Sequence, residues 1–176
     1  MIRILLGVVL IAGCDKRKDP APAPAPPPLG SNSELPDPLN LDWQSLRYDL
    51  GSLGVVKATA GRAVFRVVDD DSGALHATQE PDPAAESAGF LDLDPPTLVD
   101  VDGDHHEESV IPFELKSAHD SVFGAFVFTL RDGNPVQLAT IPTTKKAGFT
   151  VDGQAIRTAE GACWQWNATT RTLELR

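Results

Sequence analysis

The residues VFGAFVFTL (122–130), RDGN (131–134) and PVQLATI (135–141) are the stretch that decides the fold. The first part is rich in Val and Phe, which favour extended strands. Asp132-Gly133 is typical of a tight turn, because both residues tolerate the positive φ that a two-residue hairpin needs. Residues 135–141 again have the composition of a strand. We therefore expect an antiparallel hairpin here.

Strand patterns recur on both sides of this hairpin, and turn residues separate them. The other expected strands are 54–59, 63–68, 108–115, 148–151, 154–158, 163–167 and 172–175. Short Gly-containing connections predict that 54–59 pairs with 63–68, and that 148–151 pairs with 154–158. Residues 69–89 have loop composition, and only 41–50 could hold a helical turn or two. The sequence predicts a mainly β protein: an antiparallel β-sandwich or a curved, partly closed sheet of about nine short strands.

Length and charge restrict the classes of protein to which the chain can belong. Its 176 residues, 41% of them hydrophobic, suffice for one ordinary domain, which we place at 41–176. The formal net charge is −10. A domain this acidic is repelled by phosphate backbones, so no nucleic-acid partner is expected. The charge is explained either by solubility or by attraction for cations.

The first 40 residues have the order of a targeting segment followed by a spacer. Arg3 precedes an apolar run, and the small residues Ala12 and Gly13 come directly before Cys14. This order predicts a signal peptide at 1–13. Residues 14–40 contain alternating prolines, which favour a polyproline II rod and a flexible tether. The stretch 11–14 resembles the bacterial lipobox, and the resemblance implies fatty acyl chains on Cys14 and a permanent anchor in a bacterial membrane.

Acidic residues alternate in the most distinctive loop, which reads DVDGDHHEE from 100 to 108. Asp100, Asp102 and Asp104 are spaced two apart, and Glu108 begins an apolar strand. Short loops of this kind present several carboxylate oxygens to a hard cation such as Ca²⁺. Without a cation the carboxylates would repel one another. The other interpretation is a solvated turn, because aspartates hydrogen-bond nearby amides.

The loop is similar to the calcium loops of FG-GAP and VCBS repeats. The resemblance implies side-chain ligands from Asp100, Asp102 and Asp104, a backbone carbonyl from His106, and the last acidic ligand from Glu108. The glycine that usually follows the third acid is His105 here, which adopts positive φ only at some cost. Residues 41–176 also resemble a set of small, uncharacterised bacterial exported proteins, which brings no established activity.

Two other groups of residues are candidates for binding. His105 and His106, with Glu107 or Glu108, could be ligands for zinc, although adjacent residues of an extended chain point to opposite faces. Trp164 and Trp166 share one face of an expected strand and could form a platform for a sugar or peptide. The alternative for this pair is ordinary packing in the core. Cys163 lies in the same apolar strand, so we expect it to be buried and inert.

Together these features predict a membrane-anchored lipoprotein of the cell envelope, with its domain facing the periplasm or the cell exterior. The sequence has no Gly-x-Ser-x-Gly elbow, Walker loop or His-Glu-x-x-His helix. We therefore expect a non-catalytic binding or structural module, stabilised by calcium, whose partner is an envelope protein or glycan. The alternative is an envelope hydrolase or metal-dependent enzyme that uses the acidic loop 100–108.

Overall fold

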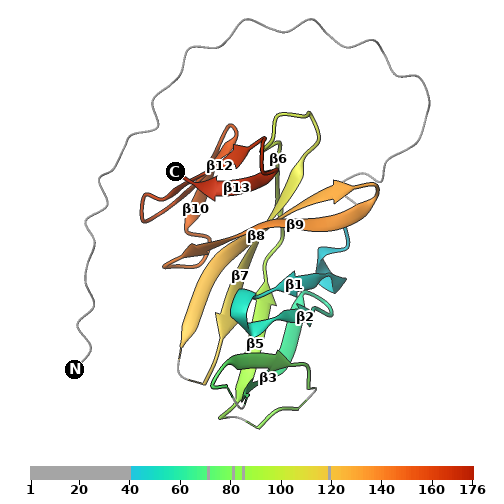
Figure 1. Cartoon of the computed structure of the whole chain (residues 1–176), viewed down its shortest axis with the longest axis vertical. Helices are drawn as coiled ribbons and strands as arrows, with labels where there is room; N and C mark the ends of the chain where they lie inside the picture. The colour runs from blue at the N-terminus through green and yellow to red at the C-terminus, as the bar shows by residue number, and fades with distance from the viewer. Residues whose placement is uncertain (1–40, 71, 81, 85, 119) are drawn as a thin grey trace, which may run out of the picture. The chain divides into compact units, whose positions relative to one another are not determined.

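The computed structural model describes residues 41–176 except 71, 81, 85 and 119. All of these residues belong to one unit, Ser33–Arg176. The predicted signal peptide, the lipidation of Cys14 and the Pro-rich tether lie outside the described residues. Antiparallel sheets dominate the described part (Figure 1), which confirms the prediction of a mainly β fold. The helices of this part are two single turns, η2 (Trp43–Ser45) and η3 (Gly51–Leu53).

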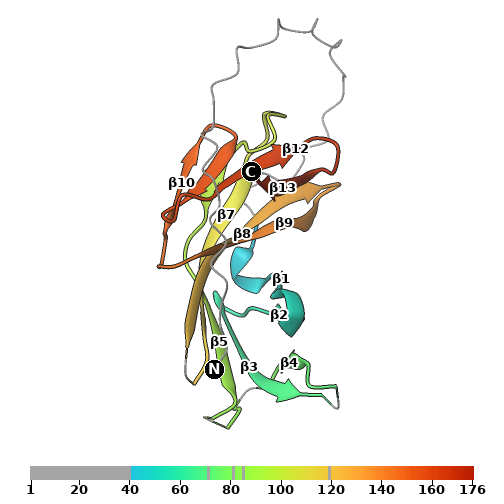
Figure 2. The same ribbon diagram turned by 60° about the vertical axis from the view of Figure 1, so that its left-hand side comes forward.

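The largest sheet is strongly curled, as Figures 1 and 2 show. Its strands in spatial order are β4 (Leu75–Thr78), β3 (Arg62–Asp69), β5 (Ala88–Leu93), β7 (Glu108–Lys116), β8 (Ser121–Arg131) and β9 (Asn134–Thr143), and β6 (Thr97–Val99) pairs with β7 outside this order. A second sheet contains β10 (Phe149–Asp152), β11 (Ala155–Thr158), β12 (Cys163–Asn167) and β13 (Thr172–Leu175). A small third sheet pairs β1 (Arg47–Asp49) with β2 (Val55–Lys57).

The hairpin predicted from 122–141 is confirmed. Strands β8 and β9 pair from Phe123↔Thr143 to Arg131↔Asn134, and one register shift follows Val127. Asp132 and Gly133 have φ values of 52° and 75°, as a two-residue hairpin turn requires. The hairpin β10–β11 also forms as expected, and the expected strands β12 and β13 pair with each other.

Two expectations about the first half of the domain are wrong. Residues 54–59 and 63–68 do not form a hairpin, because β2 pairs with β1 whereas β3 pairs with β4 and β5. The two segments separate after one bridge, Thr59↔Arg62, because Val56 of β2 pairs with Tyr48 of β1 and both side chains are buried there. Residues 69–89 are not one long loop, because they include β4, whose exposed side chains give no alternating pattern.

Strand β8 is covered on both faces, which explains its nearly continuous apolar run. Phe126 and Phe128 belong to one hydrophobic cluster, whereas the alternate residues Ala125 and Val127 belong to the other. The first cluster contains the ring of Tyr48, whose centroid is 4.8 Å from that of Phe126. The second cluster joins β7, β8 and β9 to residues of the second sheet. The core therefore has two layers, which share the central strands β7 and β8.

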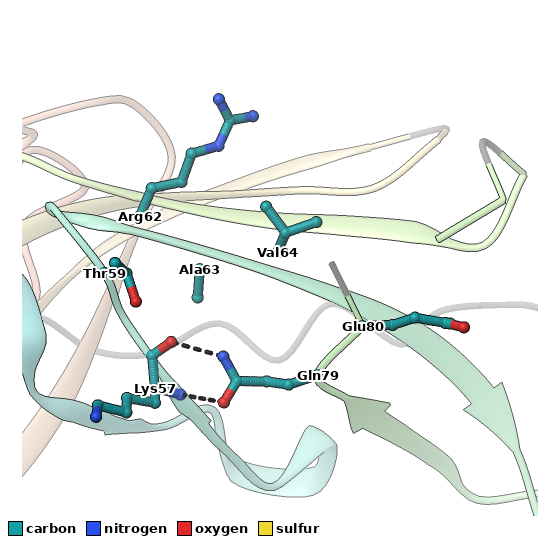
Figure 3. Close-up of a pocket in the computed structure, with 7 residues that line it drawn as sticks. All are labelled: Lys57, Thr59, Arg62, Ala63, Val64, Gln79 and Glu80. Atoms are coloured by element: carbon teal, nitrogen blue, oxygen red, sulfur yellow. Dashed lines mark hydrogen bonds between the residues drawn. The ribbon is translucent and has the colours of Figure 1, made fainter. Parts of the chain in front are cut away.

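Two glutamine side chains join the small sheet to both edges of the curled sheet. The Asp49 amide donates to Gln137 Oε1 at 3.0 Å, and Gln137 Nε2 donates to the Asp49 carbonyl at 3.1 Å. Gln79 forms the same pair of bonds with Lys57, at 3.1 Å and 2.6 Å, as Figure 3 shows. Gln137 lies on β9 and Gln79 directly follows β4, and these are the outer strands of the curled sheet. The sheet β1–β2 therefore bridges its open side.

Gln79→Ala will lower the free energy of unfolding by about 1 kcal/mol, because Lys57 loses both partners of its backbone. Amide exchange at Lys57 should become faster in the same variant, as hydrogen exchange followed by NMR would record. The control is Glu80→Ala, since the Glu80 side chain points away from Lys57 in Figure 3. Equal exchange rates at Lys57 in the wild type and in Gln79→Ala would contradict the bridging role.

Candidate metal centre

The acidic loop connects two paired strands, β6 and β7. The last residue pair between these strands is Val99↔Glu108. Asp100 directly follows Val99, so the first and last acidic residues of the loop lie close together. The side chain of Val101 is completely buried in the second hydrophobic cluster. Gly103 and His105 both have positive φ, at 79° and 71°. The loop thus turns sharply twice while one apolar residue fixes it to the core.

The aspartates of the loop organise its backbone by accepting hydrogen bonds from amides. Asp100 accepts from the amides of Gly103 at 2.6 Å and His105 at 3.1 Å. Asp102 Oδ1 accepts from Asp104 N at 3.1 Å, and Asp104 Oδ1 accepts from His106 N at 2.8 Å. Such local bonds explain why this composition forms a tight loop.

Three carboxylates converge at the base of this loop. Asp100, Asp102 and Glu108 each offer an oxygen, and these three atoms lie within 4.8 Å of one another. Glu108 is 1% exposed, and its oxygens accept hydrogen bonds from Val101 N at 2.9 Å and Thr129 Oγ1 at 3.1 Å. This buried acidic cluster could hold a metal ion. The prediction of a cation site is supported to that extent.

The acidic surroundings make ionisation of the cluster costly. Burial raises the pKa of Glu108 to about 7, and the charges of Asp102 and Asp104 act in the same direction. Burial also raises the pKa of Asp102, with further contributions from Asp104 and Asp100. A bound cation would reverse both effects, because an adjacent positive charge favours the ionised carboxylate.

The other predicted ligands lie on the exposed part of the loop. Asp104 is exposed and its carboxylate belongs to the amide network, while the side chain of His106 is also exposed. His105 has a side chain that is 96% exposed, with Nδ1 3.9 Å from Asp100 Oδ2. Within the described residues, the group that converges contains carboxylates and no histidine, so the arrangement does not favour the zinc alternative.

The tryptophan pair and Cys163 pack as residues of the second layer. Trp164 and Trp166 are partly buried and lie against the second hydrophobic cluster. This position matches the packing alternative, and the platform for a sugar or peptide stays a prediction. Cys163 is 5% exposed, which confirms that it is buried.

Sequence reasoning missed a polar cavity beside the acidic cluster. It has a volume of about 390 Å³, and it is lined by Asp102, Asp104, Thr129, Leu130, Arg131, Asp132 and Arg171. Arg131 lies at the end of β8, and Arg171 lies in the turn between β12 and β13. The hydrogen bond from Arg131 Nη2 to the Arg171 carbonyl, 3.1 Å long, joins these two turns. Nothing in the local sequence around either arginine indicated that they would meet.

The fold and site define a mainly β protein of antiparallel sheets with a buried acidic cluster able to hold a metal ion. No protein-family model, curated protein or solved structure matches the chain at a significant level. In the described part of the chain, none of the helices has the length and apolar character needed to cross a membrane.

Proposed function

We propose that this protein is a lipid-anchored module of a bacterial cell envelope whose loop 100–108 holds Ca²⁺. The anchor is supported by the order of a basic residue, an apolar run, small residues and Cys14, and by the Pro-rich tether that follows. The calcium site is supported by the convergence of Asp100, Asp102 and Glu108 on the folded domain. This convergence carries the proposal, because the three residues bring three negative charges to one point.

Calcium is the cation that this donor set suits best. Ca²⁺ is a hard ion that takes six to eight oxygen ligands, while zinc sites usually contain His or Cys. The carboxylates of Asp100, Asp102 and Glu108 would hold the ion, and Asp104 and the carbonyl of His106 are the remaining oxygen donors that the resemblance to calcium loops implies. The similarity of the loop to FG-GAP and VCBS repeats therefore agrees with the chemistry of the residues.

The state of Glu108 supports a non-catalytic role. Its side chain is almost completely buried, and both of its oxygens accept hydrogen bonds from the protein. A general acid or base needs to reach a substrate within hydrogen-bond distance. Glu108 is better placed to hold an ion and to fix the loop. We therefore propose a binding or structural module whose partner is an envelope protein or glycan.

Calcium should raise the melting temperature of the full chain, and Asp102→Asn should remove most of this rise. At a calcium concentration a hundredfold above Kd, the stabilisation is about 2.7 kcal/mol. The measurement is thermal unfolding in EDTA and in CaCl₂. Asp69→Asn, an exposed substitution at the end of β3, is the matched control and should keep the full response. A wild-type protein with the same melting temperature in both buffers would rule out the calcium site.

The anchor has its own test. Intact-mass analysis of protein recovered from its native bacterium should give a species that begins at Cys14 and carries the added mass of fatty acyl chains. Cys14→Ser should move the protein from the membrane fraction to the soluble fraction, whereas Cys163→Ser should leave it in the membrane. A mature wild-type species that kept residues 1–13, or that lacked acyl mass, would contradict this part of the proposal.

A further inference from the structure

The cavity beside the acidic cluster is built by three turns that are far apart in the sequence. These are the loop between β6 and β7, the hairpin turn between β8 and β9, and the turn between β12 and β13. The two sheets therefore both contribute to its wall. Loops positioned by a rigid scaffold are the usual place for binding residues. The volume of about 390 Å³ lies within the range of small-molecule sites.

Charged side chains of both signs line this cavity, and its arginines have no ion-pair partner among the described residues. Within the described part of the chain, no carboxylate lies within 4.0 Å of the guanidinium groups of Arg131 and Arg171. The only protein hydrogen bond from either guanidinium to a described residue is the bond from Arg131 to the Arg171 carbonyl. A guanidinium has five donors, so most of the donors of both arginines remain for a ligand.

A second cavity of the domain differs in this respect. It lies between β2 and β3, has a volume of about 490 Å³ and is lined by the residues shown in Figure 3. Arg62 at its wall is held by Asp92 at 3.3 Å and lies over the Phe90 ring. The Gln79 amide bonds to both backbone groups of Lys57. The arginine and the amide of this cavity are therefore already paired.

Calcium would make the surroundings of the cavity beside the loop less negative. Its wall contains Asp102, Asp104 and Asp132 against Arg131 and Arg171, so its formal charge is −1 without the ion. With Asp100 and Glu108, the other two carboxylates of the cluster, the formal charge is −3 without the ion and −1 with bound Ca²⁺. Anions are then repelled less, and the two guanidinium groups can form the paired hydrogen bonds that suit a carboxylate.

We infer that this cavity binds a small, polar, carboxylate-bearing ligand, and that it binds this ligand more tightly when the loop holds calcium. The inference rests on the proposed calcium site. Leu130 is the single apolar residue of the lining, so the rest of the ligand should carry hydroxyl groups. An acidic sugar has this chemistry. Its carboxylate would face Arg131 and Arg171, and the ion would favour the same negative charge.

Isothermal titration of the full chain with D-galacturonate tests this inference, with neutral D-galactose as the matched probe. We expect galacturonate to bind in CaCl₂ and to bind at least about tenfold more weakly in EDTA. Arg171→Gln should weaken galacturonate binding by about tenfold, because a charge-assisted bond is lost. The exposed Arg66→Gln on β3 is the control and should bind as the wild type does. Because coupling between two sites is reciprocal, galacturonate should raise the affinity for calcium by the same factor by which calcium raises the affinity for galacturonate.

The outcomes separate the two proposals. Calcium binding without any galacturonate binding would overturn the inference and leave the calcium site in place. The same conclusion would follow if galactose bound as well as galacturonate, or if Arg171→Gln bound like the wild type. Arg171→Gln keeps the carbonyl that Arg131 contacts, and its calcium affinity should stay within about twofold of the wild type, which shows that the loop is intact. Failure of calcium to bind at all would overturn both.

Discussion

Gly124→Ala is expected to cost at least about 3 kcal/mol of unfolding free energy, a large share of the stability of a typical domain. Gly124 lies in β8 between Phe113 on one side and Pro142 on the other. A Cβ at this position would lie 2.6 Å from the Ile141 carbonyl oxygen and 2.6 Å from the Phe113 ring. The carbonyl belongs to a paired strand, and the Phe113 ring stacks on Phe126 at 4.2 Å. Neither group has room to move away.

Urea unfolding followed by circular dichroism measures this loss. The control is Gly153→Ala, where a Cβ meets nothing within 4 Å but the backbone has a φ of 58°. That variant should lose only about 1 kcal/mol, the ordinary cost of a side chain in the left-handed region. Similar losses in the two variants would show that the space around Gly124 is not the constraint.

Glu108→Gln is expected to stabilise the protein in the absence of calcium and to destabilise it in the presence of calcium. In EDTA at pH 8 the variant should be more stable than the wild type by up to about 3 kcal/mol, because it removes a buried charge beside two aspartates. The amide can keep both contacts, since its oxygen accepts from Val101 N and the Thr129 hydroxyl can accept from its nitrogen. With calcium the same variant should be the less stable protein, because a charged ligand is lost.

The pH dependence follows from the same group. The folded state raises the pKa of Glu108 to about 7, above its value of 4.5 in an unfolded chain. Below pH 4.5 the residue is protonated in both states and adds no penalty. As pH rises from 4.5 to 7, the unfolded state loses its proton first, so stability of the calcium-free protein falls. Above pH 7 this loss of stability is complete.

Urea titrations at pH 5 and pH 8, each in EDTA and in CaCl₂, test both statements. Thr129→Val is a useful comparison, because it removes one bond to Glu108 while leaving its charge. That variant should be less stable than the wild type in EDTA at pH 8, opposite to Glu108→Gln. A Glu108→Gln protein that was less stable than the wild type in both buffers would contradict the assignment of a costly buried charge.

The loop is connected to the core in a way that couples ion binding to folding. Val101 inserts into the second hydrophobic cluster, and its amide donates to Glu108. Glu108 in turn contacts Thr129 on the central strand β8. A ligand that binds the folded loop and not the unfolded chain stabilises the fold by its binding free energy. This is why unfolding experiments report on the site.

Strands with strong local patterns could be predicted from the sequence. All nine expected strands are present, and the central one spans Ser121–Arg131 where 122–130 was expected. The strands that were missed are β1, β4, β5 and β6. Strands β1, β4 and β6 have only three or four residues each. They form strands because a neighbouring strand offers hydrogen-bond partners for their backbone. Such pairing leaves little trace in the residues themselves.

The candidate site also contains residues that the sequence predicts and residues that only the fold brings together. Asp100, Asp102 and Glu108 could be chosen from the sequence because they lie in one short loop, where chain geometry limits how far apart they can be. Glu108 is hydrogen-bonded to Thr129, and the cavity brings together Arg131 and Arg171, which are separated by 40 positions. No local pattern relates residues at that separation. The roles of Asp104 and the His106 carbonyl as ligands stay predictions.

The sequence by itself determined the β class, the Asp132-Gly133 hairpin and the position of the acidic loop. These follow from interactions between near neighbours, such as turn chemistry and side-chain composition, which the chain carries wherever it is placed. Only the tertiary structure decided that β2 and β3 separate, that Gln137 bonds to Asp49 across 88 positions, and that three turns enclose one cavity. Those outcomes depend on which distant surfaces bury each other, and that is settled by the packing of the whole domain.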